Sequence, residues 1–266
     1  MLKAAELSRS TYYYQLNRLS SLDERMDLAA KIRALYHRHR GRYGYRRITA
    51  ALRQAGERVN HKAVQRRMAT MGLKSLVRIK KYKAYRGVEG EASPNQLDRK
   101  FRAEKPNQKW ATDITEFKVA GQRLYLSPVM DLFNGEIVAY DIHRRPMFAM
   151  VQRMLAKAVA RLRPGDTPLL HSDQGWQYRQ PAYRSQLAVH GITQSMSRKA
   201  TCLDNAAMES FFGTLKAEYF YLNHFDSIED LEHGLEEYIH YYNHERIKLK
   251  LGGLSPVHYR TGVLAA

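Results

Sequence analysis

WATDITEF, residues 110–117, predicts a β-strand with a carboxylate, Asp113, near its centre. β-Branched and aromatic residues dominate this stretch, as in a half-buried strand. A turn at Ala120-Gly121-Gln122 follows, and the apolar run from Leu124 to Met130 predicts the returning strand of a hairpin. The stretch therefore predicts the start of a sheet, with an acid on its first strand.

Further strands and helices follow this hairpin. A third strand is predicted from Ile137 to Ile142, and strand and helix patterns then alternate: a helix over 147–162, a buried strand at Leu169-Leu170, a helix over 181–190 and a short strand over 192–196. Three antiparallel strands and then β/α alternation predict an α/β fold with a mixed sheet. Periodicity alone allows other α/β arrangements.

Two more acids stand in comparable settings. Asp173 ends the apolar run PLLHSD and is followed by Gly175, while Glu209 lies in the predicted helix NAAMESFFGTLK, residues 205–216. Thirty-five residues separate these two acids, and Lys216 follows Glu209 by two helical turns. Three carboxylates converging at the end of a sheet would hold a pair of hard divalent cations for phosphoryl transfer on nucleic acid.

Each acid also has a simpler interpretation when it is taken alone. Asp113 is then a surface carboxylate, Asp173 a turn residue and Glu209 an exposed helical acid. The ordered set favours one shared site. Asp131 is a fourth acid on the sheet; a structural role is favoured, with a metal-adjacent role as the alternative. For His171, a supporting hydrogen bond is favoured over proton transfer.

Positive charge is concentrated in the N-terminal part of the chain. Residues 1–100 hold 24 lysines and arginines against 8 acidic residues, a net charge of +16, whereas residues 101–266 carry only +2. Three helices are predicted there, over 22–40, over 45–55 and after the capping residue Asn60. This arrangement predicts a DNA-binding helix-turn-helix module. The alternative is an ordinary helical bundle with solvated arginines.

Four short motifs, in order, resemble those of the retroviral-integrase-like transposases of bacterial insertion sequences, in particular the product of the second of two overlapping reading frames. They are GRYGYRRI (41–48), PNQKWATD (106–113), HSDQG (171–175) and NAAME (205–209). The resemblance implies a ribonuclease-H-like catalytic domain in which Asp113, Asp173 and Glu209 bind two Mg²⁺ ions, with Mn²⁺ as a substitute.

The resemblance also implies contacts and partners. DNA contacts are expected from two residues of the predicted catalytic helix and from the basic N-terminal region: Lys216, Asn205, Arg46, Arg47, Lys62, Arg66, Arg67, Lys80, Lys81 and Lys83. The expected partners are the terminal inverted repeats of the element, target DNA, further copies of the chain and the upstream reading-frame product.

The predicted organisation has four parts: a helix-turn-helix domain (1–72), a basic linker (73–100), a catalytic core (101–225) and a C-terminal helix and tail (226–266). The predicted function is strand cleavage and strand transfer at the ends of an insertion sequence. A catalytically inert DNA-binding regulator is the alternative, and a stand-alone ribonuclease H explains the basic N-terminal region poorly.

Other classes are disfavoured by what the sequence lacks. No glycine-rich phosphate loop suggests ATP dependence, and the single cysteine, Cys202, permits neither an internal disulfide nor a thiolate cluster. No secretory signal or long apolar run is present, so a cytoplasmic, nucleoid-associated protein without a membrane partner is expected.

Overall fold

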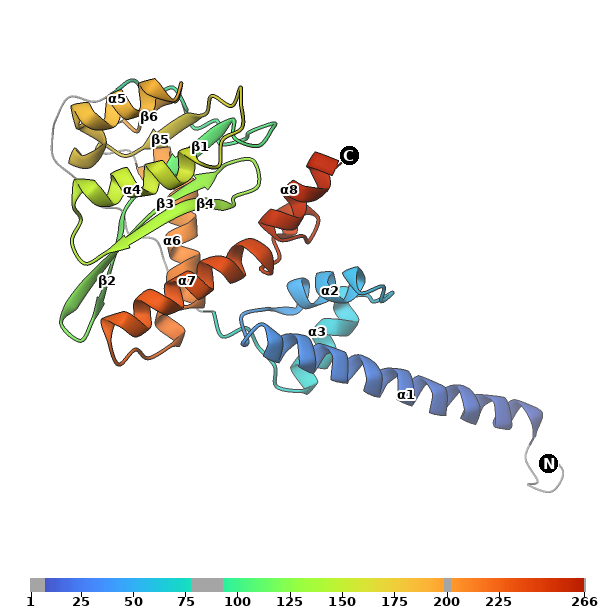
Figure 1. Cartoon of the computed structure of the whole chain (residues 1–266). Helices are drawn as coiled ribbons and strands as arrows, with labels where there is room; N and C mark the ends of the chain where they lie inside the picture. Colours follow the sequence, from blue (N-terminus) through green and yellow to red (C-terminus); the bar gives the residue numbers. More distant parts are fainter. Residues whose placement is uncertain (1–7, 78–92, 199–201, 266) are drawn as a thin grey trace. The chain divides into compact units, whose positions relative to one another are not determined.

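The computed structural model describes residues 8–77, 93–198 and 202–265. The chain divides into two compact units, Met1–Arg78 and Ile79–Ala266 (Figure 1). The first is helical, and the second combines a mixed sheet with helices on both of its faces.

Three helices form the N-terminal unit: α1 (Arg9–Arg38), α2 (Tyr45–Gln54) and α3 (His61–Thr70). The three-helix prediction is confirmed, but α1 begins at Arg9 and not near Leu22, because the Ser8 hydroxyl caps a single long helix by accepting a hydrogen bond from the Thr11 amide. Asn60 caps α3 as predicted. The fully or nearly fully buried core residues include Ile32, Tyr43, Ile48, Leu52, Val64 and Met68.

Six strands form the sheet of the second unit: β1 (Lys109–Thr112), β2 (Thr115–Val119), β3 (Gln122–Asp131), β4 (Ile137–His143), β5 (Leu169–Ser172) and β6 (Thr193–Met196). β3 pairs antiparallel with β1, β2 and β4, while β1 pairs parallel with β5 and β5 pairs parallel with β6. The predicted sequence of an antiparallel region followed by β/α alternation is confirmed.

The prediction of one continuous strand through Asp113 is wrong. β1 ends at Thr112 and β2 begins at Thr115, yet both lie along β3 in one register, with Thr112 opposite Val129 and Thr115 opposite Leu126. The strand is interrupted where the Asp113 carboxylate accepts a hydrogen bond from the Ile114 amide at 2.7 Å. Asp113 therefore lies in a break of the sheet.

Helices cover the sheet on both sides and enclose two hydrophobic cores (Figure 1). α4 (Phe148–Val159) and α5 (Pro181–Val189) pack on the face that carries Trp110. α6 (Ala206–Glu218) and α7 (Ile228–His244) pack on the face that carries Ala111. Neighbouring residues of a strand thus pack into opposite cores, because successive side chains point to opposite faces of a sheet.

The C-terminal region contains one helix more than predicted. α7 begins at the predicted cap, Ser227, with a full capping box, but α8 (Pro256–Ala265) follows it. From α8, Arg260 donates hydrogen bonds to the buried carboxylates of Asp131 and Glu136 at the end of the sheet. Asp131 also accepts hydrogen bonds from the Asn107 and Phe133 amides, which supports the structural role favoured for it.

α7 lies close to the end of α6 because residue 234 has no side chain. A Cβ atom added at Gly234 would lie 1.5 Å from the Tyr219 hydroxyl oxygen. Replacing Gly234 by Ala should therefore lower the free energy of unfolding by about 1–3 kcal/mol, the usual cost of overpacking a core. Chemical denaturation of the full chain measures this change.

Gly213→Ala is the matched control. An added Cβ there meets nothing within 4 Å, and alanine is favoured over glycine inside a helix by roughly 0.5–1 kcal/mol. The control should therefore be slightly stabilising. A Gly234→Ala protein as stable as Gly213→Ala would contradict the close approach of α7 to Tyr219.

Candidate active site

Parallel pairing of β1 with β5 brings two of the predicted acids together. The register places Ala111 opposite His171, and Asp113 and Asp173 each follow two residues later, just beyond the ends of their strands. Carboxyl ends of neighbouring parallel strands share one edge of a sheet, which is where ligand sites form in open α/β folds. The two aspartates therefore lie side by side at this edge.

α6 supplies the third acid. Its first turn carries Glu209, and the residue before α6, Asn205, donates a hydrogen bond from Nδ2 to the Thr112 carbonyl oxygen at 3.2 Å. This bond fastens the start of α6 to the residue that precedes Asp113. Glu209 lies one helical turn after Asn205, and its charge acts on Asp113.

Electrostatic interactions link the three acids. Burial, together with the charges of Asp173 and Glu209, raises the pKa of Asp113 to about 8. Burial also raises the pKa of Asp173, although the Gly175 amide and Arg179 act in the opposite direction. Tyr178 lies behind both aspartates; its pKa is raised well above the ordinary value by burial and by their two charges.

A tight turn holds the Asp173 carboxylate. The Gly175 amide donates to Asp173 Oδ1 at 2.9 Å, and a Cβ on residue 175 would lie 2.9 Å from the same oxygen. The turn leads into the 3₁₀ helix η1 (Trp176–Arg179), in which Tyr178 is buried and Trp176 is exposed. Glycine is therefore needed at position 175, because the backbone there lies too close to the Asp173 carboxylate for a larger residue.

Tyr178 and Arg179 are site residues that the sequence analysis missed. They follow Gly175, the last residue of the HSDQG motif, by three and four residues. A predicted turn or helix over residues 173–179 would have indicated that they lie close to Asp173. Their positions depend on the fold of η1 onto the sheet, which no local pattern specifies.

Lys216 lies on the same side of α6 as Glu209. Its charge acts on Asp113, and its Nζ atom lies 5.2 Å from the centre of the Phe117 ring, a cation–π contact. Asn205, predicted to contact DNA, is 5% exposed and bonded to Thr112. Its burial favours a role in holding the acids over a DNA contact.

His171 lies behind the site. It is fully buried, its Nδ1 atom is 2.9 Å from the Ser195 hydroxyl oxygen, and burial lowers its pKa to about 4. The imidazole is therefore neutral near pH 7, which supports the favoured interpretation of His171 as a hydrogen-bonding residue.

The donor chemistry of the three acids suits a hard divalent cation. Carboxylate oxygens are its preferred ligands, and the charges of Asp173 and Glu209 add to the effect of burial in raising the pKa of Asp113. Within the described ranges, no three His, Cys, Asp or Glu side chains form a ready-made metal cage. Metal binding by the acids is therefore inferred from their charge and chemistry, not from a preformed coordination geometry.

The predicted DNA-binding residues of the N-terminal unit lie on two helices. Arg46 and Arg47 begin α2, and Lys62, Arg66 and Arg67 lie on α3. Arg46, Lys62 and Arg66 are exposed, whereas Arg47 lies 5.4 Å from the Tyr43 ring centre. Lys80, Lys81 and Lys83 lie outside the described residues.

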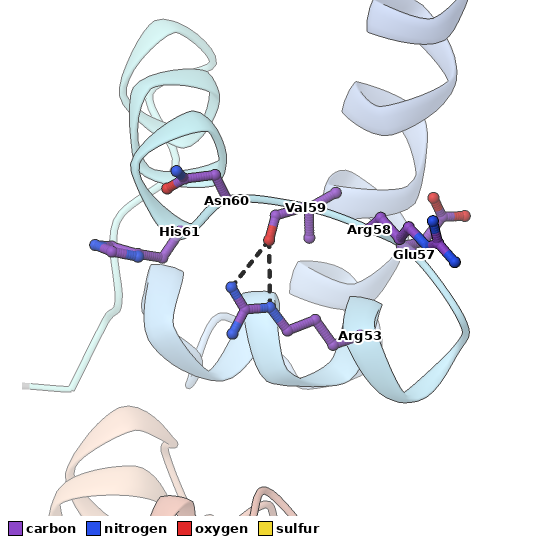
Figure 2. A pocket seen from close by; sticks show the side chains of 6 residues that line it. All are labelled: Arg53, Glu57, Arg58, Val59, Asn60 and His61. Carbon is purple, nitrogen blue, oxygen red and sulfur yellow. Dashed lines mark hydrogen bonds between the residues drawn. The ribbon is translucent and has the colours of Figure 1, made fainter.

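A hollow of about 520 Å³ lies at the turn between α2 and α3. Figure 2 shows Arg53 reaching from α2 to the Val59 carbonyl oxygen, to which its Nε and a terminal nitrogen donate at 3.2 and 3.0 Å. These bonds fix the turn that leads into Asn60 and α3. The hollow is thus part of the helix-turn-helix geometry and contains none of the three acids.

Residues 93–99, which the sequence assigns to a linker, bond to β6 of the catalytic unit. The Gln96 and Leu97 amides both donate to the Ser195 hydroxyl oxygen. In the described part of the chain, no helix is long and apolar enough to cross a membrane.

Family comparisons match both units of the chain. Residues 103–202 and 209–264 match families described as Integrase core domain, and residues 21–81 match a family described as HTH-like domain. Among solved structures, the catalytic core domain of HTLV-2 integrase in complex with magnesium aligns with a TM-score of 0.49 at 16% identity, covering 60% of this chain and 99% of that one.

Two curated relatives from Escherichia coli (strain K12) match along nearly the whole chain. The putative transposase InsK for insertion sequence element IS150 is 54% identical over 260 residues, which cover 98% of this chain and 92% of that protein. The transposase InsF for insertion sequence IS3A is 32% identical, with 100% and 94% covered. No comparison supports the inert-regulator alternative. The chain therefore belongs to the insertion-sequence transposases, DDE-type polynucleotidyl transferases with an integrase core domain.

Proposed function

We propose that Asp113, Asp173 and Glu209 bind the divalent cations with which this transposase cleaves and joins DNA strands at the ends of its insertion sequence. The observation that carries the proposal is the parallel pairing of β1 with β5, because Asp113 and Asp173 follow the ends of these neighbouring strands and the start of α6, which carries Glu209, is bonded to Thr112. The charges of Asp173 and Glu209 add to the effect of burial in raising the pKa of Asp113, and a bound cation would offset this repulsion.

In this proposal the three acids bind the cations, and Lys216 binds the DNA. Asp113 and Asp173 offer carboxylate oxygens from the ends of paired strands, so their spacing is set by the sheet. Glu209 offers a third carboxylate from α6. Bound Mg²⁺, or Mn²⁺ in its place, would activate the attacking oxygen and stabilise the leaving one, and two ions suit in-line displacement at phosphorus. Lys216 holds a positive charge beside the acids, where it can bind a DNA phosphate.

The N-terminal unit supplies DNA affinity in this proposal. Exposed cations on α2 and α3, including Arg46, Lys62 and Arg66, contact phosphates of the terminal inverted repeats. Since an element has two ends and a target, we propose that several copies of the chain assemble on DNA. The upstream reading-frame product is a further proposed partner, and the four domain boundaries given above belong to the same proposal.

Neutral isosteres at the three acids test the catalytic proposal. Asp113→Asn, Asp173→Asn and Glu209→Gln should each lower the rate of strand cleavage and joining by roughly 10³-fold or more, and double variants should lose little beyond this, since the residues act as one unit. DNA affinity should change little. Rates on element-end DNA in Mg²⁺ measure the effect, with the exposed residue change Glu104→Gln as the control. Activity of Glu209→Gln equal to that of Glu104→Gln would refute the three-acid site.

The raised pKa of Asp113 predicts an unusual dependence of stability on pH. In metal-free protein the folded state retains the Asp113 proton up to about pH 8, whereas an unfolded aspartate loses it near pH ~3.9. The folded state thus binds more protons over this range, so the stabilising contribution of protonated Asp113 is lost as pH rises towards 8.

The melting temperature in EDTA should therefore fall between pH 5 and pH 8 more steeply for the wild type than for Asp113→Asn. Added Mg²⁺ should raise the melting temperature of the wild type at pH 8 and leave that of Asp113→Asn nearly unchanged. Equal slopes for the two metal-free proteins would show that neither burial nor the neighbouring acids raise the pKa of Asp113.

The salt dependence of binding tests the DNA-binding proposal. Each phosphate contact contributes about 0.9 to the slope of log affinity against log salt concentration. The double variant Lys62→Ala/Arg66→Ala should reduce this slope by about 2, whereas Lys250→Ala, an exposed cation of the other unit, should not. Fluorescence anisotropy on element-end duplexes over a range of salt concentrations measures it. An unchanged slope in the double variant would exclude α3 from the phosphate contacts.

A further inference from the structure

Asp204 is a buried acid that the proposed catalytic chemistry does not use. It lies in the 3₁₀ helix η2 (Cys202–Asn205), directly before α6, and its side chain is fully buried. Three residues donate hydrogen bonds to its carboxylate: Asn95 from Nδ2 at 2.8 Å, Arg99 from Nε at 2.8 Å, and Arg198 from its backbone amide at 3.0 Å and from Nε at 3.1 Å. A buried carboxylate with this many partners joins three segments of the chain.

The charge of Asp204 is retained in the folded protein. Burial alone would raise its pKa, but the hydrogen bonds from Arg198 and Arg99 and the charge of Arg198 hold the pKa well below the ordinary value. The Asp204 side chain is fully buried, whereas the side chains of Arg99 and Arg198 are 46% and 54% exposed. Losing these donors would leave a buried carboxylate without its full set of hydrogen bonds, which is costly.

Two of the three partners belong to the segment that enters the catalytic unit, residues 93–99. This segment is also fixed along β6, where the Gln96 and Leu97 amides donate to the Ser195 hydroxyl at 2.9 and 3.1 Å. The Ser195 hydroxyl in turn contacts His171 on β5, two residues before Asp173. The entering segment is thus linked indirectly to β5, because it bonds to Ser195 and Ser195 contacts His171. It is linked directly to the residues before α6, because it bonds to Asp204.

The residue after Asp204 is bonded to the end of β1, the strand that precedes Asp113. Asn205 donates to the Thr112 carbonyl, and Glu209 follows one helical turn later. We propose that Asp204 is a positioning residue that fixes α6 to the entering segment 93–99, so that Glu209 faces Asp113 only when this segment is in place. This inference rests on the proposed metal-binding role of the three acids.

The alternative is that Asp204 only stabilises the fold. The two roles differ in what they predict for a variant that still folds. A stabilising residue changes the melting temperature but not the catalytic rate or metal affinity per folded molecule. A positioning residue changes the rate constant and the metal affinity while leaving the affinity for DNA intact, because the DNA-binding unit is unaffected.

The test compares three variants of the full-length protein. Asp204→Asn keeps the shape of the side chain but removes its charge, and Asn95→Ala removes one donor to it. Asp98→Asn is the matched control, since Asp98 is an exposed acid of the same segment, whose ion pairs with Lys100 and Arg198 are long, at 3.7 and 3.9 Å. Its φ of 44° is one that asparagine tolerates.

Four quantities are measured for each variant: kcat and KM for cleavage of element-end DNA, the Kd for Mn²⁺ by electron paramagnetic resonance in the absence of DNA, and the melting temperature. Asp204→Asn should lower kcat and weaken Mn²⁺ binding by about 10–100-fold, the usual effect of losing a residue that orients metal ligands. KM should change little. Asn95→Ala should shift kcat and the Mn²⁺ Kd in the same direction, and Asp98→Asn should match the wild type.

Glu209→Gln, assayed in parallel, separates the two hypotheses. If Glu209→Gln is inactive while Asp204→Asn and Asn95→Ala match Asp98→Asn in kcat and Mn²⁺ affinity, the positioning role is wrong and the catalytic proposal stands. If Glu209→Gln is fully active, the catalytic proposal itself fails. Should Asp204→Asn not fold, Asn95→Ala and Arg99→Gln decide, because each leaves Asp204 with other donors; wild-type kcat and Mn²⁺ affinity in both would overturn the inference.

Discussion

Repulsion between carboxylates at the edge of the sheet is the constraint to which the rest of the catalytic unit responds. Asp113 and Asp173 follow neighbouring parallel strands, so the pairing of β1 with β5 holds two like charges together. Glu209 adds a third. Burial and these neighbouring charges together raise the pKa of Asp113. Only a rigid scaffold can keep them at this edge.

Buried contacts around α6 provide this rigidity. Asn205 fastens the start of the helix to β1. At its other end, Glu218 forms a buried pair with Arg246, with both N–O distances at 2.7 Å, and also accepts from the Tyr238 hydroxyl. Hydrophobic packing against Ala111 and Phe117 covers the face between these points. α6 is thus held at both ends and along one side, so Glu209 is carried by an element with little freedom.

Local sequence patterns predicted most of the elements, and the order of the three acids along the chain, together with the family resemblance, predicted a shared site at the edge of the sheet. Strand alternation and helix caps such as Asn60 and Ser227 are properties of neighbouring residues, which is why they could be read directly. The break at Asp113 could not, because it depends on a side chain bonding to the next amide. The contacts of Asp204 join residues about a hundred positions apart, and the burial of Asn205 depends on β1. Such contacts exist only once the sheet is assembled.

The break between β1 and β2 keeps the register of the sheet, with Thr112 and Thr115 pairing along one line of β3. Ala111 before the break and Phe117 after it consequently face the same core. Because side chains alternate between faces, one residue gained or lost here would turn Phe117 and its neighbours to the opposite face. The hairpin turn at Ala120 and Gly121 is different, since nothing lies within 4 Å of a Cβ added at Gly121. Over evolutionary time, insertions and deletions should therefore accumulate at that turn and be excluded from the few residues around Asp113.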